Sequence, residues 1–319
     1  MPFPNIENPL IAIVGPTAVG KTDLSLFLAR KLGCEIISAD SRLFYRGMDI
    51  GTAKPSLEER SEFTHHLIDI TEPNETLSLS LFQKKAYEAI LDIQSRKHIP
   101  ILVGGTGQYV WSVLHGWEIP EKEPDDRLRT ALENWAKEIG AEGLYRRLQI
   151  LDPVAAKRIQ YQNVRRTVRA LEVILGTGRL FSEQSRRTSN PYNVIVIGIS
   201  LPRDELYQKI DLRIDDMFAR GFISEVENLL CRGFTGSLPT MSAIGYREVI
   251  WYLQGRATLE EAKTLMKRRT REFVRRQANW FKTVDEEINW FDYGPEFERK
   301  VLDFVSDKWK LRHEDQSGR

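Results

Sequence analysis

The sequence predicts an α/β protein built on a parallel β-sheet, and three observations predict it. Short apolar runs of strand length recur up to residue 103 and return at residue 194. Apolar residues at helical spacing lie between these runs. Glycine-rich turns follow two of the runs, and open parallel sheets bind ligands beyond the carboxyl ends of their strands. A ligand-binding edge is therefore expected where these turns lie.

The first predicted strand, residues 10–14, continues directly into a phosphate-loop motif. Its residues Leu-Ile-Ala-Ile-Val are all apolar, as in a buried strand. The next eight residues, Gly-Pro-Thr-Ala-Val-Gly-Lys-Thr, match the pattern G-x-x-x-x-G-K-[ST], and leucines at helical spacing follow. This context predicts a di- or triphosphate site, and the alternative is a chance glycine-rich turn. The predicted phosphate-binding residues are Gly15, Pro16, Thr17, Ala18, Val19, Gly20, Lys21 and Thr22.

Each part of this loop has a physical role. Gly15 and Gly20 let the backbone curve so that its N–H groups point at one anion, and the helix that follows adds its positive end. Lys21 contributes a positive charge, and the hydroxyl of Thr22 can hold Mg²⁺.

The remaining elements are predicted in chain order. Strands are expected at residues 34–39, 66–70, 99–103 and 194–199, and helices at residues 79–96, 204–232, 241–254 and 258–283. Asp40 and Ser41 follow the strand at 34–39, and a Gly-Gly-Thr-Gly turn containing Thr106 follows the strand at 99–103. Because the carboxyl ends of parallel strands share one edge, we expect Asp40 and Thr106 beside the phosphate loop.

The sequence also predicts an inserted domain. Composition changes at residues 119–124, and from there the pattern is helical, polar and strand-free until the sheet pattern returns at residue 194. We therefore expect a P-loop core that begins in residues 1–118, a helical insertion in 119–191, completion of the core with C-terminal helices in 192–310, and a flexible tail in 311–319.

Composition excludes several classes of protein. The chain has 319 residues, 41% of them hydrophobic, which is enough to bury a sizeable core. The formal net charge of +1 argues against a general polyanion binder. Two cysteines, Cys34 and Cys231, suit a reduced cytosol, and no apolar run approaches the ~18 residues of a membrane span. With no signal-peptide pattern at the start, we expect a cytoplasmic protein. We also expect that it contacts no membrane and that it acts as a monomer.

Positive charge is concentrated in the predicted helix 258–283. Residues 263–282 hold eight basic residues against one acid. Met266, Phe273 and Trp280 recur every seven residues and are predicted to form its core-facing stripe. Charge of one sign beside a tryptophan suits a nucleic-acid backbone with a base to stack, and the alternative is a solvated basic helix. Arg165, Arg166 and Arg169 form a second cluster, whose alternative is a salt-bridged surface.

Longer motifs resemble those of the tRNA dimethylallyltransferase (isopentenyltransferase) family. The resemblance covers about residues 8–292 in the expected order. Besides the phosphate loop, it rests on Ala-Asp-Ser-Arg-Leu-Phe-Tyr-Arg-Gly-Met-Asp-Ile-Gly-Thr-Ala-Lys-Pro (39–55), Leu-Val-Gly-Gly-Thr-Gly-Gln-Tyr (102–109), Asp-Pro-Val-Ala-Ala (152–156), Asn-Val-Arg-Arg (163–166), Arg-Ala-Leu-Glu-Val (169–173), Ile-Gly-Tyr-Arg (244–247), Arg-Arg-Gln (275–277) and Trp-Phe (280–281).

The resemblance implies a fold, a reaction and a set of site residues. The fold would be a P-loop NTPase-like sheet with a helical insertion. The reaction would transfer a dimethylallyl group from dimethylallyl diphosphate to N6 of adenosine 37, in the anticodon stem-loop of tRNAs reading UNN codons, with Mg²⁺ at Thr22. The implied catalytic residues are Lys21, Asp40, Thr106 and Arg213. The implied tRNA-binding residues are Asp40, Ser41, Arg42, Leu43, Thr106, Arg127, Gln162, Asn163, Val164, Arg165, Arg166, Ser242, Ala243, Ile244, Gly245, Tyr246, Arg247, Arg275, Arg276, Gln277, Ala278, Asn279, Trp280, Phe281 and Lys282.

The chemistry of this reaction makes independent demands on the residues. The N6 amine of adenine is a poor nucleophile because its lone pair is delocalised into the ring, so it needs a base, which Asp40 would supply. An allylic diphosphate ionises once the charge on its leaving group is neutralised, which requires cations such as Lys21. The alternatives are a helix N-cap for Asp40, a turn residue for Thr106 and a surface arginine for Arg213.

Departures from the family pattern are small. Arg42-Leu43 stands where many relatives have Met-Gln or a similar pair, and Gln108 where they have Leu. Both lie near the expected acceptor channel, so they bear on base recognition rather than on the chemistry. Three rival functions stay open from the sequence: an ATP-dependent phosphoryl transferase, an adenylate isopentenyltransferase with a free nucleotide as acceptor, and a non-catalytic RNA-binding protein.

Overall fold

The structure is a computed structural model that describes residues 6–119, 125–183 and 191–310. It divides into two compact units. The first combines Met1–Leu114 with Pro191–Arg319, and the second is His115–Asn190. The second unit overlaps the predicted insertion 119–191, and the predicted tail 311–319 lies outside the described residues.

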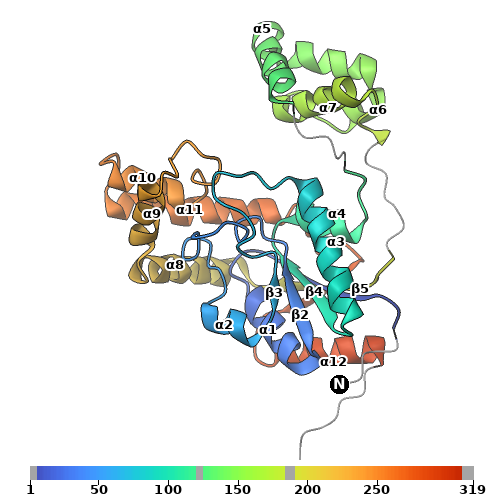
Figure 1. The fold of residues 1–319 in the computed structure, drawn as a ribbon, viewed down its shortest axis with the longest axis vertical. Coiled ribbons are helices and arrows are strands. Elements are labelled where there is room, and N and C mark those ends of the chain that lie inside the picture. Colours follow the sequence, from blue (N-terminus) through green and yellow to red (C-terminus); the bar gives the residue numbers. More distant parts are fainter. Residues whose placement is uncertain (1–5, 120–124, 184–190, 311–319) are drawn as a thin grey trace, which may run out of the picture. The chain divides into compact units, whose positions relative to one another are not determined.

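A six-stranded parallel sheet forms the centre of the first unit (Figure 1). Its spatial order is β3-β2-β4-β1-β5-β6. The strands are β1 (Pro9–Val14), β2 (Cys34–Ser38), β3 (His65–His66), β4 (Ile99–Gly104), β5 (Asn193–Ser200) and β6 (Ile288–Asp292). Every residue of β1 is buried, and β4 and β5 pair with its two edges. The predicted α/β fold class is confirmed.

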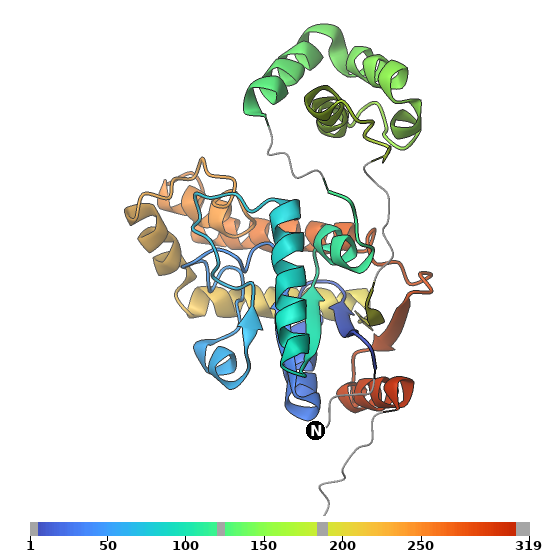
Figure 2. The same cartoon turned by 45° about the vertical axis from the view of Figure 1, so that its right-hand side comes forward.

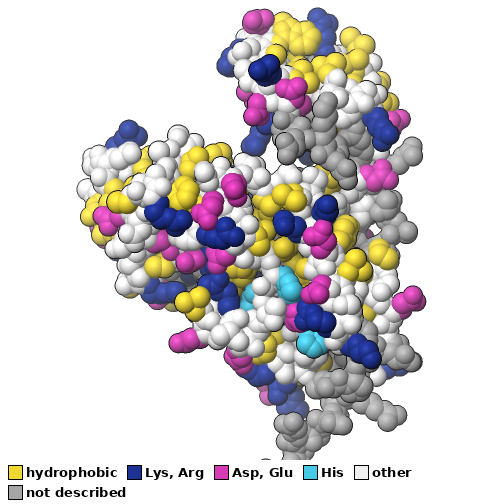
Figure 3. All heavy atoms as spheres, in the orientation of Figure 1, with side chains coloured by type: hydrophobic (Ala, Val, Ile, Leu, Met, Phe, Trp, Pro, Cys, Tyr) yellow, Lys and Arg dark blue, Asp and Glu magenta, His cyan; other side chains and the backbone are white. Residues whose placement is uncertain are grey.

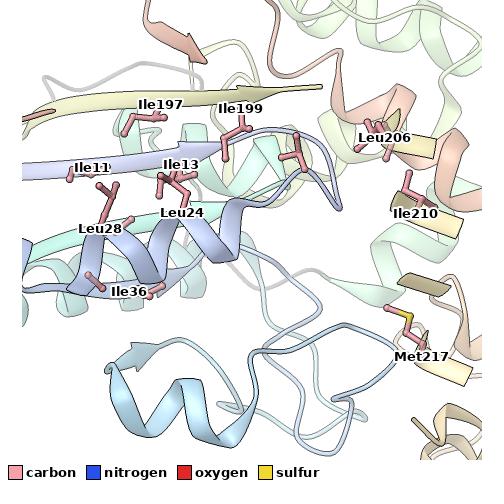
Figure 4. Close-up of a cluster of buried hydrophobic side chains, with 14 of the residues drawn as sticks. Ile11, Ile13, Leu24, Leu28, Ile36, Ile197, Ile199, Leu206, Ile210 and Met217 are labelled. Carbon is pink, nitrogen blue, oxygen red and sulfur yellow. The ribbon is translucent and has the colours of Figure 1, made fainter. Parts of the chain in front are cut away.

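Helices cover both faces of this sheet. In the first unit they are α1 (Lys21–Leu32), α2 (Leu57–Glu62), α3 (Leu79–Ser95), α4 (Gly107–Leu114), α8 (Arg203–Ala219), α9 (Phe222–Cys231), α10 (Tyr246–Leu253), α11 (Leu259–Gln277) and α12 (Phe297–Trp309). Leu24 and Leu28 of α1 point toward Ile11 and Ile13 of β1 in the main hydrophobic core (Figure 4). Helices α3 and α4 pack against β4, and α8 and α11 run side by side (Figure 2).

Several predicted boundaries are wrong, each for a local reason. The predicted helix 204–232 is two helices, because Gly221 adopts a left-handed φ of 96° between α8 and α9. The predicted strand 66–70 ends after His66, since Leu67 and Asp69 also have left-handed φ angles. Strand β6 and helix α12 were not predicted.

The second unit is a small helical bundle with its own apolar core. Its helices are α5 (Asp126–Leu151), α6 (Pro153–Lys157) and α7 (Val164–Thr177), and Gly140, with φ of 76°, interrupts α5. Leu144 and Leu148 are fully buried in this core. Asp152 is fully buried as well, and it accepts hydrogen bonds from the N–H groups of Ala155 (2.9 Å) and Ser182 (2.8 Å). Asp152 therefore ties the start of α6 to the segment after α7.

Within the described ranges, no helix combines the length and the hydrophobicity that a membrane span requires.

Candidate active site

The phosphate loop has the backbone geometry that its two glycines predict. Gly15 has φ of 144°, and a Cβ there would lie 2.8 Å from the carbonyl oxygen of Ile199. Gly20 has φ of 102° and forms the N-cap of α1. A Cβ on Gly20 would lie 2.9 Å from the Tyr293 ring. Larger residues would therefore force this loop away from the neighbouring strand and ring.

Lys21 is folded back onto its own loop. Its Nζ donates hydrogen bonds to the carbonyl oxygens of Pro16 (2.7 Å) and Gly15 (3.1 Å). Burial lowers the pKa of Lys21 to about 8, and the nearby Arg213 lowers it as well, whereas the Asp40 carboxylate raises it. The positive charge of the Lys21 ammonium is thus only partly balanced by the protein, which favours binding of an anion at this loop.

A cavity of about 350 Å³ lies beside the loop, at the carboxyl edge of the sheet. Lys21, Asp40 and Arg213, which are distant in sequence, all line it. Its other lining residues are Thr17, Ala18, Gly20, Thr22, Asp23, Leu43, Thr52, Ala53, Val103, Gly104 and Lys209. Thr106, the remaining predicted catalytic residue, does not line the cavity. It directly precedes α4, and its carbonyl oxygen accepts the N–H of Tyr109 (2.9 Å).

Asp40 is half-buried at the start of the loop after β2. Its Oδ1 accepts the backbone N–H of Arg42 at 3.0 Å, which fixes the carboxylate in a local turn. No helix begins at this residue, so the alternative interpretation as a helix N-cap is excluded.

Arg213 reaches the cavity from α8. Its Nη2 lies 3.4 Å from the carbonyl oxygen of Thr52. Burial lowers the pKa of Arg213, while Asp40 raises it. One helical turn earlier, Lys209 lines the same cavity, and its Nζ lies 3.3 Å from the centroid of the Tyr293 ring. The sequence reasoning missed Lys209, although its i, i+4 spacing to Arg213 was a usable signal.

The loop that carries Thr52 is held by one carboxylate. Glu225 of α9 accepts the backbone N–H groups of Asp49 (2.9 Å), Ile50 (2.6 Å) and Gly51 (3.1 Å). It also accepts the hydroxyl of Tyr246 at 2.6 Å. Tyr246 is fully buried, so its predicted contact with RNA needs a different interpretation, as a support for this loop.

Gln277, at the end of α11, joins two glycine-rich loops. It is 4% exposed. Its Oε1 accepts the N–H of Thr17 in the phosphate loop, and its Nε2 donates to the carbonyl oxygen of Gly105 after β4, both at 2.9 Å. A predicted RNA-binding residue is thus placed inside the protein, behind the cavity.

Much of the positive charge of α11 is neutralised by acids from other helices. Lys267 pairs with Asp215 at 2.8 Å, Arg269 pairs with the buried Glu248, and Arg271 pairs with Asp211. On the face shown in Figure 3, basic and acidic side chains are similarly interspersed. Among the residues that the structure describes, Arg275, Arg276 and Lys282 have no acidic partner. The predicted core-facing stripe is wrong at its end, since Trp280 lies beyond α11 and is 43% exposed.

The predicted tRNA-binding residues fall into three groups by exposure. The exposed ones are Arg42, Arg127, Gln162, Asn163, Arg165, Arg166, Ser242, Arg275, Arg276, Ala278, Asn279, Trp280 and Lys282. The half-buried ones are Asp40, Ser41, Leu43, Thr106, Val164, Ile244 and Arg247. The buried ones are Ala243, Gly245, Tyr246, Gln277 and Phe281. In the second cluster, Arg169 pairs with Glu172 at 3.0 Å, as the salt-bridge alternative proposes, whereas Arg165 and Arg166 are exposed.

The fold and the cavity define an α/β protein with a phosphate loop whose site suits a polyphosphate anion. Comparison with known proteins narrows this class. A model of the IPP transferase family matches residues 43–284. The chain belongs to this family.

Relatives and solved structures agree with that assignment. The tRNA dimethylallyltransferase of Roseiflexus castenholzii is 54% identical over 276 residues, which cover 86% of this chain and 90% of the relative. That of Carboxydothermus hydrogenoformans is 46% identical over 303 residues, covering 94% and 97%. The tRNA isopentenylpyrophosphate transferase of Bacillus halodurans superposes with a TM-score of 0.71 at 40% identity, covering 95% of this chain and 97% of that one. A eukaryotic dimethylallyltransferase, described as acting on tRNA, has a TM-score of 0.81 at 28% identity, covering 97% and 81%.

Proposed function

We propose that this chain is a tRNA dimethylallyltransferase, which transfers a dimethylallyl group from dimethylallyl diphosphate to N6 of adenosine 37 and releases diphosphate. Family membership supports the reaction class. The observation that carries the assignment to this site is the shared cavity of Lys21, Arg213 and Asp40, since two cations and one carboxylate are the groups that the reaction requires.

The cations would hold the diphosphate of the donor. The N–H groups at the start of α1 and the ammonium of Lys21 favour the anion at one side of the cavity. Arg213 and Lys209 approach from α8. As the allylic C–O bond breaks, negative charge grows on the leaving diphosphate, and these fixed cations lower the free energy of that charge. The apolar side chains of Leu43 and Val103 in the same cavity suit the five-carbon group.

Asp40 would accept the proton from N6 as the C–N bond forms. Its Oδ1 is held by the N–H of Arg42, so its other oxygen is available to the acceptor. The adenine base has to leave the stack of the anticodon loop to reach this carboxylate. Thr106, at the start of α4, would orient the base or the departing diphosphate.

Mg²⁺ would be held by Thr22 together with the diphosphate oxygens. Thr22 lines the cavity, and its hydroxyl oxygen is the kind of ligand that Mg²⁺ prefers. Within the described part of the chain, no group of three or more His, Cys, Asp or Glu residues could hold a metal ion alone. When bound, Mg²⁺ would neutralise part of the diphosphate charge. Transfer is expected to stop with EDTA, to return with Mg²⁺, and to need more Mg²⁺ in a Thr22→Val variant.

The acceptor would be the anticodon stem-loop of tRNA, held by the exposed arginines of α11. In the second unit, Arg127, Arg165 and Arg166 are exposed and would also suit tRNA phosphates. Backbone phosphates would supply affinity, and unstacked bases would supply selectivity. One chain carries both the donor cavity and these arginines, so we propose that it acts as a monomer, in the cytoplasm where tRNA is found.

Radiolabelled dimethylallyl diphosphate tests the proposal, with unmodified tRNA, AMP or no acceptor. We expect label in tRNA together with stoichiometric release of diphosphate. Label on AMP alone would identify an adenylate isopentenyltransferase instead. Absence of transfer, with conversion of ATP to ADP in the presence of a metabolite, would identify a phosphoryl transferase.

A further inference from the structure

Gln277 lies between the exposed arginines that would bind RNA and the phosphate loop that would bind the donor. It is the last residue of α11 and directly follows Arg275 and Arg276. Those two arginines are exposed, whereas Gln277 is 4% exposed. Gln277 does not line the cavity, so it acts on a ligand there only through other residues.

The orientation of its amide is determined by its partners. A backbone N–H can only donate and a carbonyl oxygen can only accept, so Oε1 must face Thr17 and Nε2 must face Gly105. Both bonds are 2.9 Å long. One side chain therefore bridges the phosphate loop and the loop after β4, just beyond Val14 and Gly104, the last paired residues of β1 and β4.

Packing around the amide leaves little freedom for the loop after β4. A Cβ on Gly105 would collide with Nε2 of Gln277, and a Cβ on Gly107 would collide with Trp280. The indole N–H of Trp111 on α4 also donates to the carbonyl oxygen of Trp280, at 3.1 Å. The loop after β4 is thus fastened to the end of α11 at several points.

In the proposed reaction, the two loops would hold different reacting groups. Thr17 belongs to the phosphate loop, which would hold the donor, and Gly105 immediately precedes Thr106, which would orient the acceptor base or the departing diphosphate. A change of about 1 Å in their separation would misalign donor and acceptor, and such misalignment can lower a rate about a hundredfold.

We propose that Gln277 is a positioning residue, which sets the distance between the donor loop and the acceptor loop without touching either substrate. The proposal rests on the proposed function. It reassigns Gln277 from contact with RNA to alignment of the reacting groups.

Two substitutions distinguish a positioning role from direct contact with the donor or with RNA. Gln277→Met keeps the length of the side chain but loses both hydrogen bonds. We expect kcat to fall at least tenfold, while KM for dimethylallyl diphosphate, the Kd for inorganic pyrophosphate and the Kd for the RNA stem-loop stay within about threefold.

Gln277→Glu keeps an acceptor for Thr17 but donates to Gly105 only when protonated, and burial raises the pKa of a carboxyl group. Its kcat relative to wild type should therefore rise as the pH is lowered from 8 to 6.

Gln94 provides a matched control. It is a half-buried glutamine of α3 whose Nε2 donates to the carbonyl oxygen of Pro9, also at 2.9 Å, at the start of β1 and away from the cavity. Gln94→Met loses a comparable bond, and its kcat should stay within about twofold of wild type. Amide hydrogen exchange of the phosphate-loop peptide gives a readout that needs no turnover, because exchange at Thr17 should accelerate in Gln277→Met and not in Gln94→Met.

The outcomes distinguish the two proposals. If wild type transfers dimethylallyl groups and Gln277→Met retains kcat within twofold, the positioning role is overturned. It is also overturned if pyrophosphate or RNA affinity falls by the same factor as kcat. If wild type transfers no dimethylallyl group, the proposed function fails. In that case amide hydrogen exchange still tests the inference, because an unchanged exchange rate at Thr17 in Gln277→Met would overturn it.

Discussion

The hydroxyl of Tyr246 donates a 2.6 Å hydrogen bond to Glu225, whose carboxylate also accepts three consecutive backbone N–H groups of the loop at residues 49–51. This loop continues to Thr52, whose carbonyl oxygen lies 3.4 Å from Arg213. A pair of residues on α9 and α10 therefore supports the loop that contributes Thr52 to the lining of the cavity. Burial and the adjacent Glu225 carboxylate raise the pKa of Tyr246 well above its ordinary value, so its hydroxyl remains protonated and able to donate.

Tyr246→Phe is expected to lower the free energy of unfolding by about 1 kcal/mol, because one buried hydrogen bond is lost. It should lower kcat severalfold through the loop and leave RNA affinity within twofold. Thermal unfolding, steady-state kinetics and RNA binding measure the three effects. Tyr252→Phe on the same helix is the control, since the Tyr252 hydroxyl makes no hydrogen bond within the described residues. A selective loss of RNA affinity in Tyr246→Phe would contradict the supporting role.

Asp40→Asn tests the proposed base. The amide oxygen can still accept the N–H of Arg42, so the local turn should survive. We expect kcat to fall about 10²–10⁴-fold, as for other general bases, with RNA and pyrophosphate binding retained. Asp23→Asn makes the same change at another carboxylate of the cavity and should retain activity within about threefold. Near-normal turnover of Asp40→Asn would refute the assignment.

Local patterns in the sequence predicted the centre of this protein well. The apolar run at residues 10–14 and the phosphate-loop motif depend on contacts between near neighbours in the chain, and the structure places them as expected. Asp40 was located by a topological rule about strand ends, which holds because the sheet is parallel. Lys21 and Arg213 also meet Asp40 in one cavity.

Features that depend on distant parts of the chain were not predicted. The sequence shows Arg269 as a free cation of a basic helix, but its partner Glu248 lies on another helix. Tyr246 and Gln277 carry polar groups that suit RNA, and only the fold shows that those groups are buried against Glu225 and Thr17. Strand β6 is a short edge strand containing Asn289 and Asp292, so it lacks the continuous apolar run of a central strand.

The lowered pKa of Lys21, about 8, predicts a pH dependence of diphosphate binding. Above this pH the ammonium of the free protein loses its proton, and affinity for the anion should fall. Because a bound diphosphate favours the charged lysine, binding between pH 8 and 9 should take up protons from solution. Calorimetry in buffers of different ionisation enthalpy measures this uptake with inorganic pyrophosphate. Lys21→Met should bind pyrophosphate more weakly and should lack the proton uptake that is due to Lys21. Any uptake that remains in Lys21→Met comes from other groups, such as the ligand itself. Equal proton uptake in the two proteins would contradict the prediction.

Arg275 and Arg276 are expected to contact RNA phosphates, since neither has an acidic partner in the part of the chain that the structure describes, and both are exposed. Replacing both with Gln should weaken RNA binding and reduce the slope of log K against log salt by about 1.4, if each contacts one phosphate of an unpaired loop. Arg30→Gln with Lys31→Gln removes the same charge from the last turn of α1, at the opposite end of that helix from the phosphate loop. This control should leave the slope unchanged, and pyrophosphate affinity should be unchanged in both variants. A salt slope equal to that of wild type after loss of Arg275 and Arg276 would show that RNA binds elsewhere.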